Sequence, residues 1–386
     1  MRKLQLLVCF AVANFAGICL FYIWILGSQL KTRSQRGRAS DVMIFTSSAE
    51  HARYENRGNY HSHEERKESR NDIDTWLTHT LEPVKSKTST SLHQIPPVPK
   101  VSDGDDVPSL DEEIMKEYLA YPKRGATETV LILTPIHNVA GQLKKYLQLL
   151  QSITYPHLLI SVALGEDSSH DNTLHAAEEI AKELKKSFRR VNVFHFNISG
   201  QVEGTWFNVH TVLNQYRRRK HLAQARNLLL KAGYKDQDWV LWLDSDIGYF
   251  PPDIIQQLLS AKKDVVAPLC IYMDGKRKRV YDKNTWRETP LSLRHQETLS
   301  EYEVMFEGYQ PTKRLWLSDL RAEGRVVPID GVGGCTLLVR ASCHQKGLVF
   351  PEKPFEHHLE TEGLAKMAKS MNCSVYGMPF VEVKHS

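Results

Sequence analysis

One segment, residues 239–247 (WVLWLDSDI), restricts the fold more than any other. Its first five residues are apolar or aromatic, which is typical of a strand buried on both faces of a sheet. Asp244 and Asp246 follow, and their spacing puts both carboxylates on the same side of an extended chain. Such a pair is costly at the end of a buried strand unless a positive group meets it. A hard divalent cation holding a phosphate-bearing substrate suits it, although Asp-x-Asp pairs also arise by chance.

Strand and helix patterns alternate on both sides of this segment. Strands are expected at residues 130–133, 158–164, 191–196, 239–243 and 265–267, and helices at 143–153, 173–188, 217–231 and 254–259. Alternation of this kind predicts an α/β fold with a Rossmann-like, mostly parallel sheet flanked by helices.

Polar or turn-forming residues follow three of the predicted strands: Thr134 and Pro135, Glu166 and Asp167, and Asp244 and Asp246. Glu166 and Asp167 are expected in an acidic turn. Ligands in open α/β sheets bind at the carboxyl ends of the strands, so these side chains are expected to meet at one rim. The alternative is that each pair is ordinary turn chemistry.

The rest of the sequence has a looser rhythm. Residues 281–286 (YDKNTW) suit either a stacking and hydrogen-bonding surface or a loop beside the core. Residues 330–334 (DGVGG) predict a turn whose glycines let the backbone approach a ligand, but they form neither a P-loop nor a GxGxxG motif. Glu360 and Glu362 open a predicted helix, where they could simply complement its dipole. A last strand is expected at 375–383, followed by His385.

The N-terminal third has a different character. Residues 4–26 form an apolar run long enough to span a bilayer, so residues 1–30 predict a cytoplasmic tail and a retained signal anchor rather than a cleaved signal peptide. Residues 31–122 are too polar to fold alone and predict a disordered luminal stem. Residues 123–386 remain for the folded domain.

Composition adds few constraints. The net charge of +5 does not indicate a nucleic-acid partner. Of the six cysteines, Cys9 and Cys19 lie in the apolar run, and the other four show no zinc-site spacing. Those four either include one disulfide or are packed free thiols. Neither a nucleophile elbow nor an HExxH motif occurs in the sequence.

Several stretches between residues 130 and 385 resemble, in order, the fungal mannan-polymerase mannosyltransferases. The matching stretches are LILTP (131–135), LIS to DSS (159–169), AQARN (223–227), WVLWLDSD (239–246), YDKNTW (281–286), DGVGG (330–334) and ETEGLAKMA (360–368). The resemblance implies a GT-A glycosyltransferase fold, GDP-mannose as donor, Mn²⁺ as cofactor and an α-1,6-linked mannan product. It also implies a type II Golgi membrane protein that assembles with related mannosyltransferase subunits.

The resemblance assigns roles by position. Asp244 and Asp246 match the metal-binding Asp-x-Asp of the family, and His385 matches a C-terminal histidine that would be a further metal ligand. The residues expected to hold the nucleotide sugar are Thr134, Pro135, Asp167, Arg226 and Asp244. Asn227 belongs with Arg226 to a motif whose role is left open.

The expected reaction transfers mannose with retention of configuration to a mannan or N-glycan acceptor. Asp244, Asp246, Glu360 and Glu362 are the candidate catalytic residues. Glu360 or Glu362 would orient the acceptor hydroxyl or stabilise the cationic sugar. Same-face attack and double displacement both remain open. Two alternatives remain: a non-catalytic Golgi subunit that supports active partners, or a glycosyltransferase that uses another nucleotide sugar.

Overall fold

The computed structural model describes residues 126–198 and 212–386. The predicted anchor and the whole of the predicted stem lie outside these residues. Within the two described ranges, no helix is both long and apolar enough to cross a membrane.

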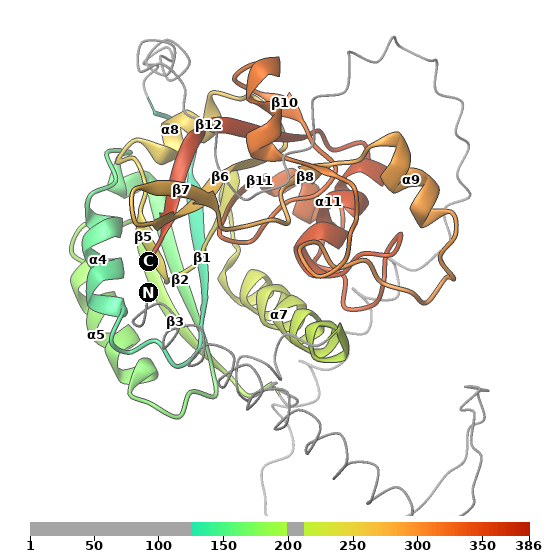
Figure 1. The fold of residues 1–386 in the computed structure, drawn as a ribbon. Coiled ribbons are helices and arrows are strands. Elements are labelled where there is room, and N and C mark those ends of the chain that lie inside the picture. Colours follow the sequence, from blue (N-terminus) through green and yellow to red (C-terminus); the bar gives the residue numbers. More distant parts are fainter. Residues whose placement is uncertain (1–125, 199–211) are drawn as a thin grey trace, which may run out of the picture. The chain divides into compact units, whose positions relative to one another are not determined.

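A ten-stranded mixed sheet is the centre of the fold (Figure 1). Its strands are β1 (Val130–Ile136), β2 (Ile160–Asp167), β3 (Arg190–Phe196), β4 (Trp239–Leu243), β5 (Ile247–Tyr249), β6 (Val265–Asp274), β7 (Arg277–Val280), β10 (Val327–Pro328), β11 (Thr336–Arg340) and β12 (Val375–His385). Their order is β10-β12-β6-β11-β4-β1-β2-β3, with β5 also paired to β12 and β7 to β6. Strands β8 (Trp286–Arg287) and β9 (Leu315–Trp316) form a separate small sheet.

Helices cover both faces of this sheet. The helices in the described residues are α4 (Leu143–Gln151), α5 (Thr173–Leu184), α7 (Val212–Gly233), α8 (Ile254–Leu259), α9 (Pro290–Gln296), α10 (Ala341–Gln345) and α11 (Glu360–Ser370), with short 3₁₀ turns η1 (His157–Leu159) and η2 (Leu317–Glu323). Figure 1 shows α4 and α5 on one side of the sheet and α7 and α11 on the other. The predicted α/β architecture is therefore confirmed.

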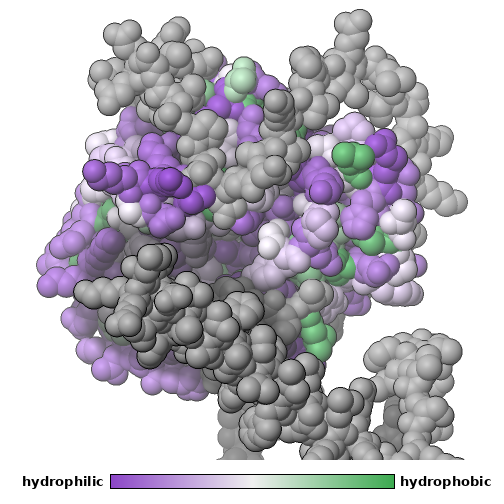
Figure 2. Space-filling model, viewed as in Figure 1, coloured by the Kyte–Doolittle hydropathy of each residue, from purple (hydrophilic) through white to green (hydrophobic). Residues whose placement is uncertain are grey.

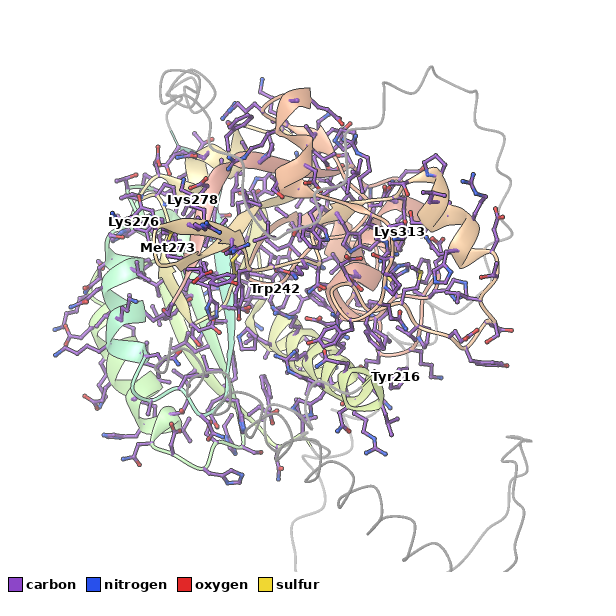
Figure 3. The ribbon with its side chains drawn as sticks, in the orientation of Figure 1. Tyr216, Trp242, Met273, Lys276, Lys278 and Lys313 are labelled. Carbon is purple, nitrogen blue, oxygen red and sulfur yellow. A yellow bond between two sulfur atoms is a disulfide. The ribbon has the colours of Figure 1, made fainter. Side chains whose placement is uncertain are left out.

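The first strand shows how the sequence builds two cores. Val130 and Ile132 belong to the core that contains α4 and α5, whereas Leu131 and Leu133 belong to the core with α7 and α11. This division follows from the alternation of side chains along a strand. Because both faces are covered, the strand is apolar throughout, as the sequence pattern predicts. In β4, Trp242 (labelled in Figure 3) is fully buried. Its ring meets that of Phe350 edge to face, with the ring centroids 4.8 Å apart.

Strand direction differs between the two sides of the sheet. β1, β2, β3 and β4 are parallel to one another. Beyond them, β11 runs antiparallel to both neighbours, β4 and β6, while β12 is parallel to β6. The expectation of a mostly parallel sheet therefore fits the first region better than the second. The reason is that β11 enters between β4 and β6 from a segment far along the chain, which local alternation does not reveal.

Four cysteines are paired in two disulfides, Cys270–Cys335 and Cys343–Cys373. Both interpretations of the sequence, a single disulfide or packed free thiols, therefore fall short. The spacing of these residues gave no guide, because each bridge joins segments that come together only in the folded sheet.

The hairpin of β6 and β7 carries a basic tip. Figure 2 shows strongly hydrophilic side chains gathered over it, and Figure 3 labels Met273, Lys276 and Lys278 there. Lys278 forms an ion pair of 2.7 Å with Glu382 of β12, so part of this charge is used to hold the hairpin to the sheet.

Candidate functional site

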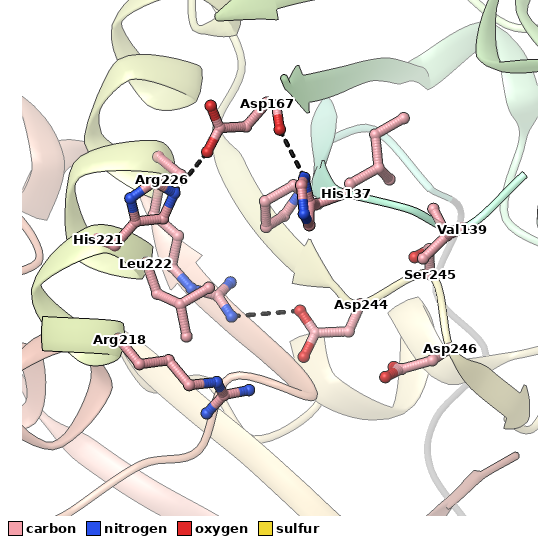
Figure 4. Close-up of a pocket in the computed structure, with 13 residues that line it drawn as sticks. His137, Val139, Asp167, Arg218, His221, Leu222, Arg226, Asp244, Ser245 and Asp246 are labelled. Carbon is pink, nitrogen blue, oxygen red and sulfur yellow. Dashed lines mark hydrogen bonds and ion pairs between the residues drawn. The ribbon is translucent and has the colours of Figure 1, made fainter. Parts of the chain in front are cut away.

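A cleft of about 320 Å³ lies at the carboxyl ends of β1, β2 and β4 (Figure 4). Its lining comes from Pro135 and the two residues after it, from Asp167, from one face of α7, and from the segment Asp244 to Asp246. The structure thus brings together the ends of three strands, as the rule for parallel sheets predicts.

Asp167 and two histidines form one end of the cleft. Nε2 of His221, on α7, lies 2.5 Å from Oδ2 of Asp167. Nδ1 of His137 lies 2.6 Å from the main-chain oxygen of Asp167. The amide of Ile198 donates to Oδ1 of Asp167 at 3.1 Å. Asp167 is the last residue of β2, not part of a turn, so the strand extends further than predicted. Both histidines lie outside any recognisable motif, so the sequence did not predict them.

Asp244 and Arg226 lie at the other end of the cleft. Arg226 is almost fully buried; its Nη2 donates to Oδ1 of Asp244 at 3.2 Å, and its Nε donates to Oε1 of Glu360 at 3.1 Å. Burial raises the pKa of Asp244 to about 7, with Asp246, Glu360 and Asp282 adding to the rise and Arg226 opposing it. Arg226 therefore joins α7, the Asp-x-Asp segment and the start of α11.

Asp246 faces His385, the last residue of β12. Their approach follows from the antiparallel pairing of His385 with Ile247 of β5 and from the hydrogen bond between the Ser386 amide and the Asp246 carbonyl. Nε2 of His385 lies 3.0 Å from Oδ2 of Asp246. Burial opposes protonation of the ring, but Asp246 raises the pKa of His385 overall. The ring of Tyr281 stacks on the imidazole with centroids 3.6 Å apart.

Asp246 and His385 fit a divalent cation as part of its ligand set. In the described part of the chain, no group of three His, Cys, Asp or Glu side chains is arranged to hold a metal. Oδ1 of Asp244 accepts a hydrogen bond from Arg226. However, Nε2 of His385 is buried without a well-aligned hydrogen-bond partner, beside a carboxylate oxygen. Imidazole and carboxylate together suit Mn²⁺.

Four predicted site residues lie outside the lining of the cleft, and one of them is His385, which contacts Asp246. Thr134 is buried and its Oγ1 lies 2.5 Å from the hydroxyl of Tyr146. Glu360 reaches the cleft only through Arg226. Glu362 is fully buried and accepts a hydrogen bond from Nε1 of Trp286 at 3.2 Å.

Asp282 belongs to this site, but the sequence analysis did not select it. Its carboxylate accepts hydrogen bonds from the amides of Asn284 and Cys335, and burial raises its pKa, with Glu360 adding to the rise. It contributes to the raised pKa of Asp244. The only signal in the sequence was an acidic residue after an aromatic one in the polar segment 281–286.

The glycine-rich loop makes room for side chains of the protein itself. A Cβ atom on Gly331 would lie 2.3 Å from the Trp286 ring, and one on Gly333 would overlap the carboxylate of Asp282. A Cβ on Gly334 would lie 2.5 Å from Nη2 of Arg226. The glycines thus make room for the chain's own side chains, and the expected close approach to a ligand stays a prediction.

Comparison with known proteins identifies relatives of the chain. The family model described as Anp1 matches residues 115–354. The mannan polymerase II complex anp1 subunit of Schizosaccharomyces pombe is 33% identical over 276 residues, which are 67% of this chain and 64% of the relative. The mannan polymerase complex subunit mnn9 of the same yeast is 34% identical over 275 residues, or 67% and 80% of the two chains. This chain thus spans slightly less than two thirds of the first relative.

Solved structures with related folds are more distant. The mannosyltransferase PcManGT from Pyrobaculum calidifontis, in complex with GDP-Man and Mn²⁺, has a TM-score of 0.42 and 14% identity, covering 71% of this chain and 62% of its own. S. aureus TarS has a TM-score of 0.40 and 17% identity, covering 67% and 36%. Likeness at this level transfers neither ligand nor activity.

The resemblance found in the sequence motifs is therefore confirmed by the comparisons. The family match spans more than half of the sequence and includes the Asp-x-Asp segment, Arg226 and the glycine-rich loop. On this evidence the chain belongs to the Anp1 family.

Proposed function

We propose that the protein is a metal-dependent glycosyltransferase with a GT-A fold that transfers mannose from GDP-mannose to a mannan or N-glycan acceptor. The observation that carries the proposal is the arrangement of one cleft. Asp246 lines one end, where Nε2 of His385, just outside the lining, lies 3.0 Å from its carboxylate; Asp167, bound to His221, lies at the other end. A nucleoside diphosphate sugar has two unlike parts that suit this arrangement, a base at one end and a charged diphosphate that carries the sugar.

The nucleotide would lie along the cleft between these two ends. Pro135 and Asp167 would border the base, and the open carboxylate end would receive the diphosphate. Asp244, already fixed by Arg226, would accept a hydrogen bond from the ribose or from a bound water. Burial of Arg226 keeps this positive group from being screened by solvent, so it would hold Asp244 in one orientation.

Asp246 and His385 would hold Mn²⁺, with further ligands from the diphosphate and water. When bound, a divalent cation neutralises the negative charge that develops on the departing nucleotide. The ring of Tyr281 restricts rotation of the His385 imidazole through the 3.6 Å stacking contact. Asp282 and Glu360 add negative charge near the place where the sugar becomes cationic.

Retention of configuration follows if the α-linked donor gives the α-1,6 linkage of a mannan backbone. The acceptor hydroxyl would then attack from the face that the nucleotide leaves, and its proton would pass to a leaving-group oxygen. Glu360 is held by Arg226, so it suits orientation of the acceptor. Glu362 is fully buried and bound to Trp286, so it would act by fixing the position of its neighbours.

Cellular setting and partners are also part of the proposal. The predicted signal anchor would place the domain in the Golgi lumen as a type II membrane protein. Several relatives are named as subunits of mannan polymerase complexes, which supports association with related subunits. The same names favour a second candidate, a subunit that supports active partners without transferring sugar itself.

The decisive experiment presents the purified protein with GDP-mannose, UDP-N-acetylglucosamine and UDP-galactose, each with Mn²⁺ and an oligomannose acceptor. We expect sugar transfer or slow hydrolysis from GDP-mannose alone, loss of both with EDTA, and recovery on adding Mn²⁺. Activity with a uridine donor would change the donor assignment. Donor binding without turnover, restored only by a related subunit, would favour the second candidate.

A further inference from the structure

The two disulfides have different surroundings. Cys270 lies within β6 and Cys335 immediately precedes β11, beside the cleft. Cys343 lies in α10 and Cys373 follows α11, and both belong to the other of the two cores. All four side chains are buried. Their local hydrogen bonds, however, go to different groups.

The main chains of Cys270 and Cys335 bind three residues of the candidate site. The amide of Asp244 donates to the carbonyl of Cys335 at 3.1 Å, and the amide of Tyr281 donates to the carbonyl of Cys270 at 2.9 Å. The amide of Asp282 lies 3.4 Å from the same Cys270 carbonyl, and its carboxylate accepts from the Cys335 amide. The disulfide therefore joins two backbone segments that together hold Asp244, Tyr281 and Asp282.

Strand pairing does not make this connection. The register of β6 with β11 consists of Val265 with Val339 and Val266 with Leu338. Cys270 and Cys335 lie beyond that register, toward the cleft. The covalent bond thus links the two strands at the level of the site, where their ladder has already ended.

We propose that the Cys270–Cys335 disulfide is a positioning cross-link for the site. It fixes the spacing between the Asp-x-Asp segment and the segment that carries Tyr281 and Asp282. Through the stacking of Tyr281 on His385, it also limits the orientation of the imidazole beside Asp246. Its effect on sugar transfer rests on the proposed function, but its effect on local structure does not.

The second disulfide provides a matched control. The carbonyl of Cys343 accepts from Lys346 and Leu348, and the amide of Cys373 donates to Ala368. None of these described residues lines the cleft. The bridges span 65 and 30 residues, and the entropic effect on the unfolded chain changes only logarithmically with this number. General stabilisation should therefore be similar for both.

The test compares the full chain with two double variants, Cys270→Ala/Cys335→Ala and Cys343→Ala/Cys373→Ala. Backbone hydrogen exchange is followed in peptides that contain residues 244–246 and 281–284. We expect about tenfold faster exchange in these peptides for the first variant alone, because their amides lose a fixed acceptor. Equal acceleration in both variants, or unchanged protection in the first, would overturn the proposal.

Two further measurements separate the possible failures. If the first variant does not fold, the same exchange is measured on folded wild-type protein after mild reduction with a phosphine. In transfer assays we expect kcat to be roughly tenfold lower for the Cys270/Cys335 variant than for the Cys343/Cys373 variant. Their unfolding midpoints should be equal, so that the difference does not reflect stability. Absence of transfer by the wild type would refute the proposed function, while the exchange data would still decide the role of the disulfide.

Discussion

The two sides of the sheet are stabilised in different ways. From β1 to β4, strands are parallel and packed between apolar faces of α4, α5 and α7. From β6 onward, the structure contains both disulfides and a buried ionic network around Arg314, whose guanidinium pairs with Glu288 and Glu307. Local apolar periodicity builds the first region, whereas specific long-range pairs build the second. The Asp-x-Asp segment lies where the two regions meet.

The largest effect on sugar transfer is expected from substitution of Asp246, the residue that both regions contact. Asp246 follows β4, and it faces His385 of β12 at 3.0 Å. We expect Asp246→Ala to lower transfer from GDP-mannose by at least about 10³-fold, because charge on the departing nucleotide is no longer offset. The measurement is kcat/KM with Mn²⁺, together with the thermal unfolding midpoint.

Asp274→Ala is the control for this substitution. Asp274 is at the exposed tip of the β6–β7 hairpin, with a side chain 60% accessible. Asp274→Ala should leave kcat/KM and the thermal unfolding midpoint unchanged. Undiminished Mn²⁺-dependent transfer by a folded Asp246→Ala protein would remove the metal assignment and, with it, the idea that the regions meet at a shared ion.

Arg226 tests whether the regions depend on one another for stability. It belongs to α7 but pairs with Glu360 of α11 at 3.1 Å. Arg226→Met leaves Glu360 and Asp244 without their cation, so we expect a loss of about 3 kcal/mol in the free energy of unfolding. The measurement is chemical denaturation.

A double-mutant cycle with Glu360→Gln sharpens this test. The double variant should lose less free energy of unfolding than the two single variants together, because the Glu360 carboxylate that Arg226→Met leaves without a partner is also removed. Arg189→Met, which removes an exposed pair with Asp236, should change stability by no more than about 0.5 kcal/mol. Additive losses at Arg226 and Glu360 would mean that the two regions are energetically independent.

The same contrast explains how much the sequence could predict. Apart from β5 and the short turn η1, the strands and helices from Val130 to Ala267 were predicted, because each is an apolar or amphipathic run bounded by turn residues. Those elements also fix the position of Pro135, Asp167, Asp244 and Asp246, since parallel strands end at a common edge. This half of the cleft follows from local patterns alone.

The other half does not follow from such patterns. Three features depend on residues tens of positions apart: the place of β11 between β4 and β6, the two disulfides, and the approach of Asp282 to Asp244. Nothing in the composition of residues 281–286 separates a site loop from a core-flanking loop. His385 was selected only because the sequence resembled a family, and the pairing of β5 with β12 supplies the physical reason for its position.

Glu288 provides a pH test that concerns the second region alone. Burial by itself would raise its pKa, but ion pairs with Lys366 and Arg314 lower it from 4.5 to about 2. The folded pKa lies below the unfolded one, so the stabilisation is present above pH 4.5 and is lost as the pH falls toward 2. The loss should be on the order of 2 kcal/mol, after allowance for relaxation.

Glu288→Gln should therefore be less stable at pH 7 and show a flatter decline in acid. Urea denaturation from pH 7 to pH 2.5 measures both. Glu183→Gln alters an exposed pair on α5 and is expected to follow the wild type throughout. An unchanged acid profile for Glu288→Gln would show that the ionic network does not distinguish the second region.

Tyr281 gives the smallest predicted effect and asks whether the second region tunes the metal ligands. Its ring lies 17° from parallel with the His385 imidazole, so Tyr281→Leu should free the ligand to rotate and weaken Mn²⁺ binding by about tenfold. Tyr281→Phe keeps the stacking and should bind Mn²⁺ as the wild type does; electron paramagnetic resonance of free Mn²⁺ measures both. Equal affinities for the Leu and Phe variants would show that the pairing of β5 with β12 alone orients His385. The orientation of His385 would then depend on backbone pairing and not on the loop that carries Tyr281.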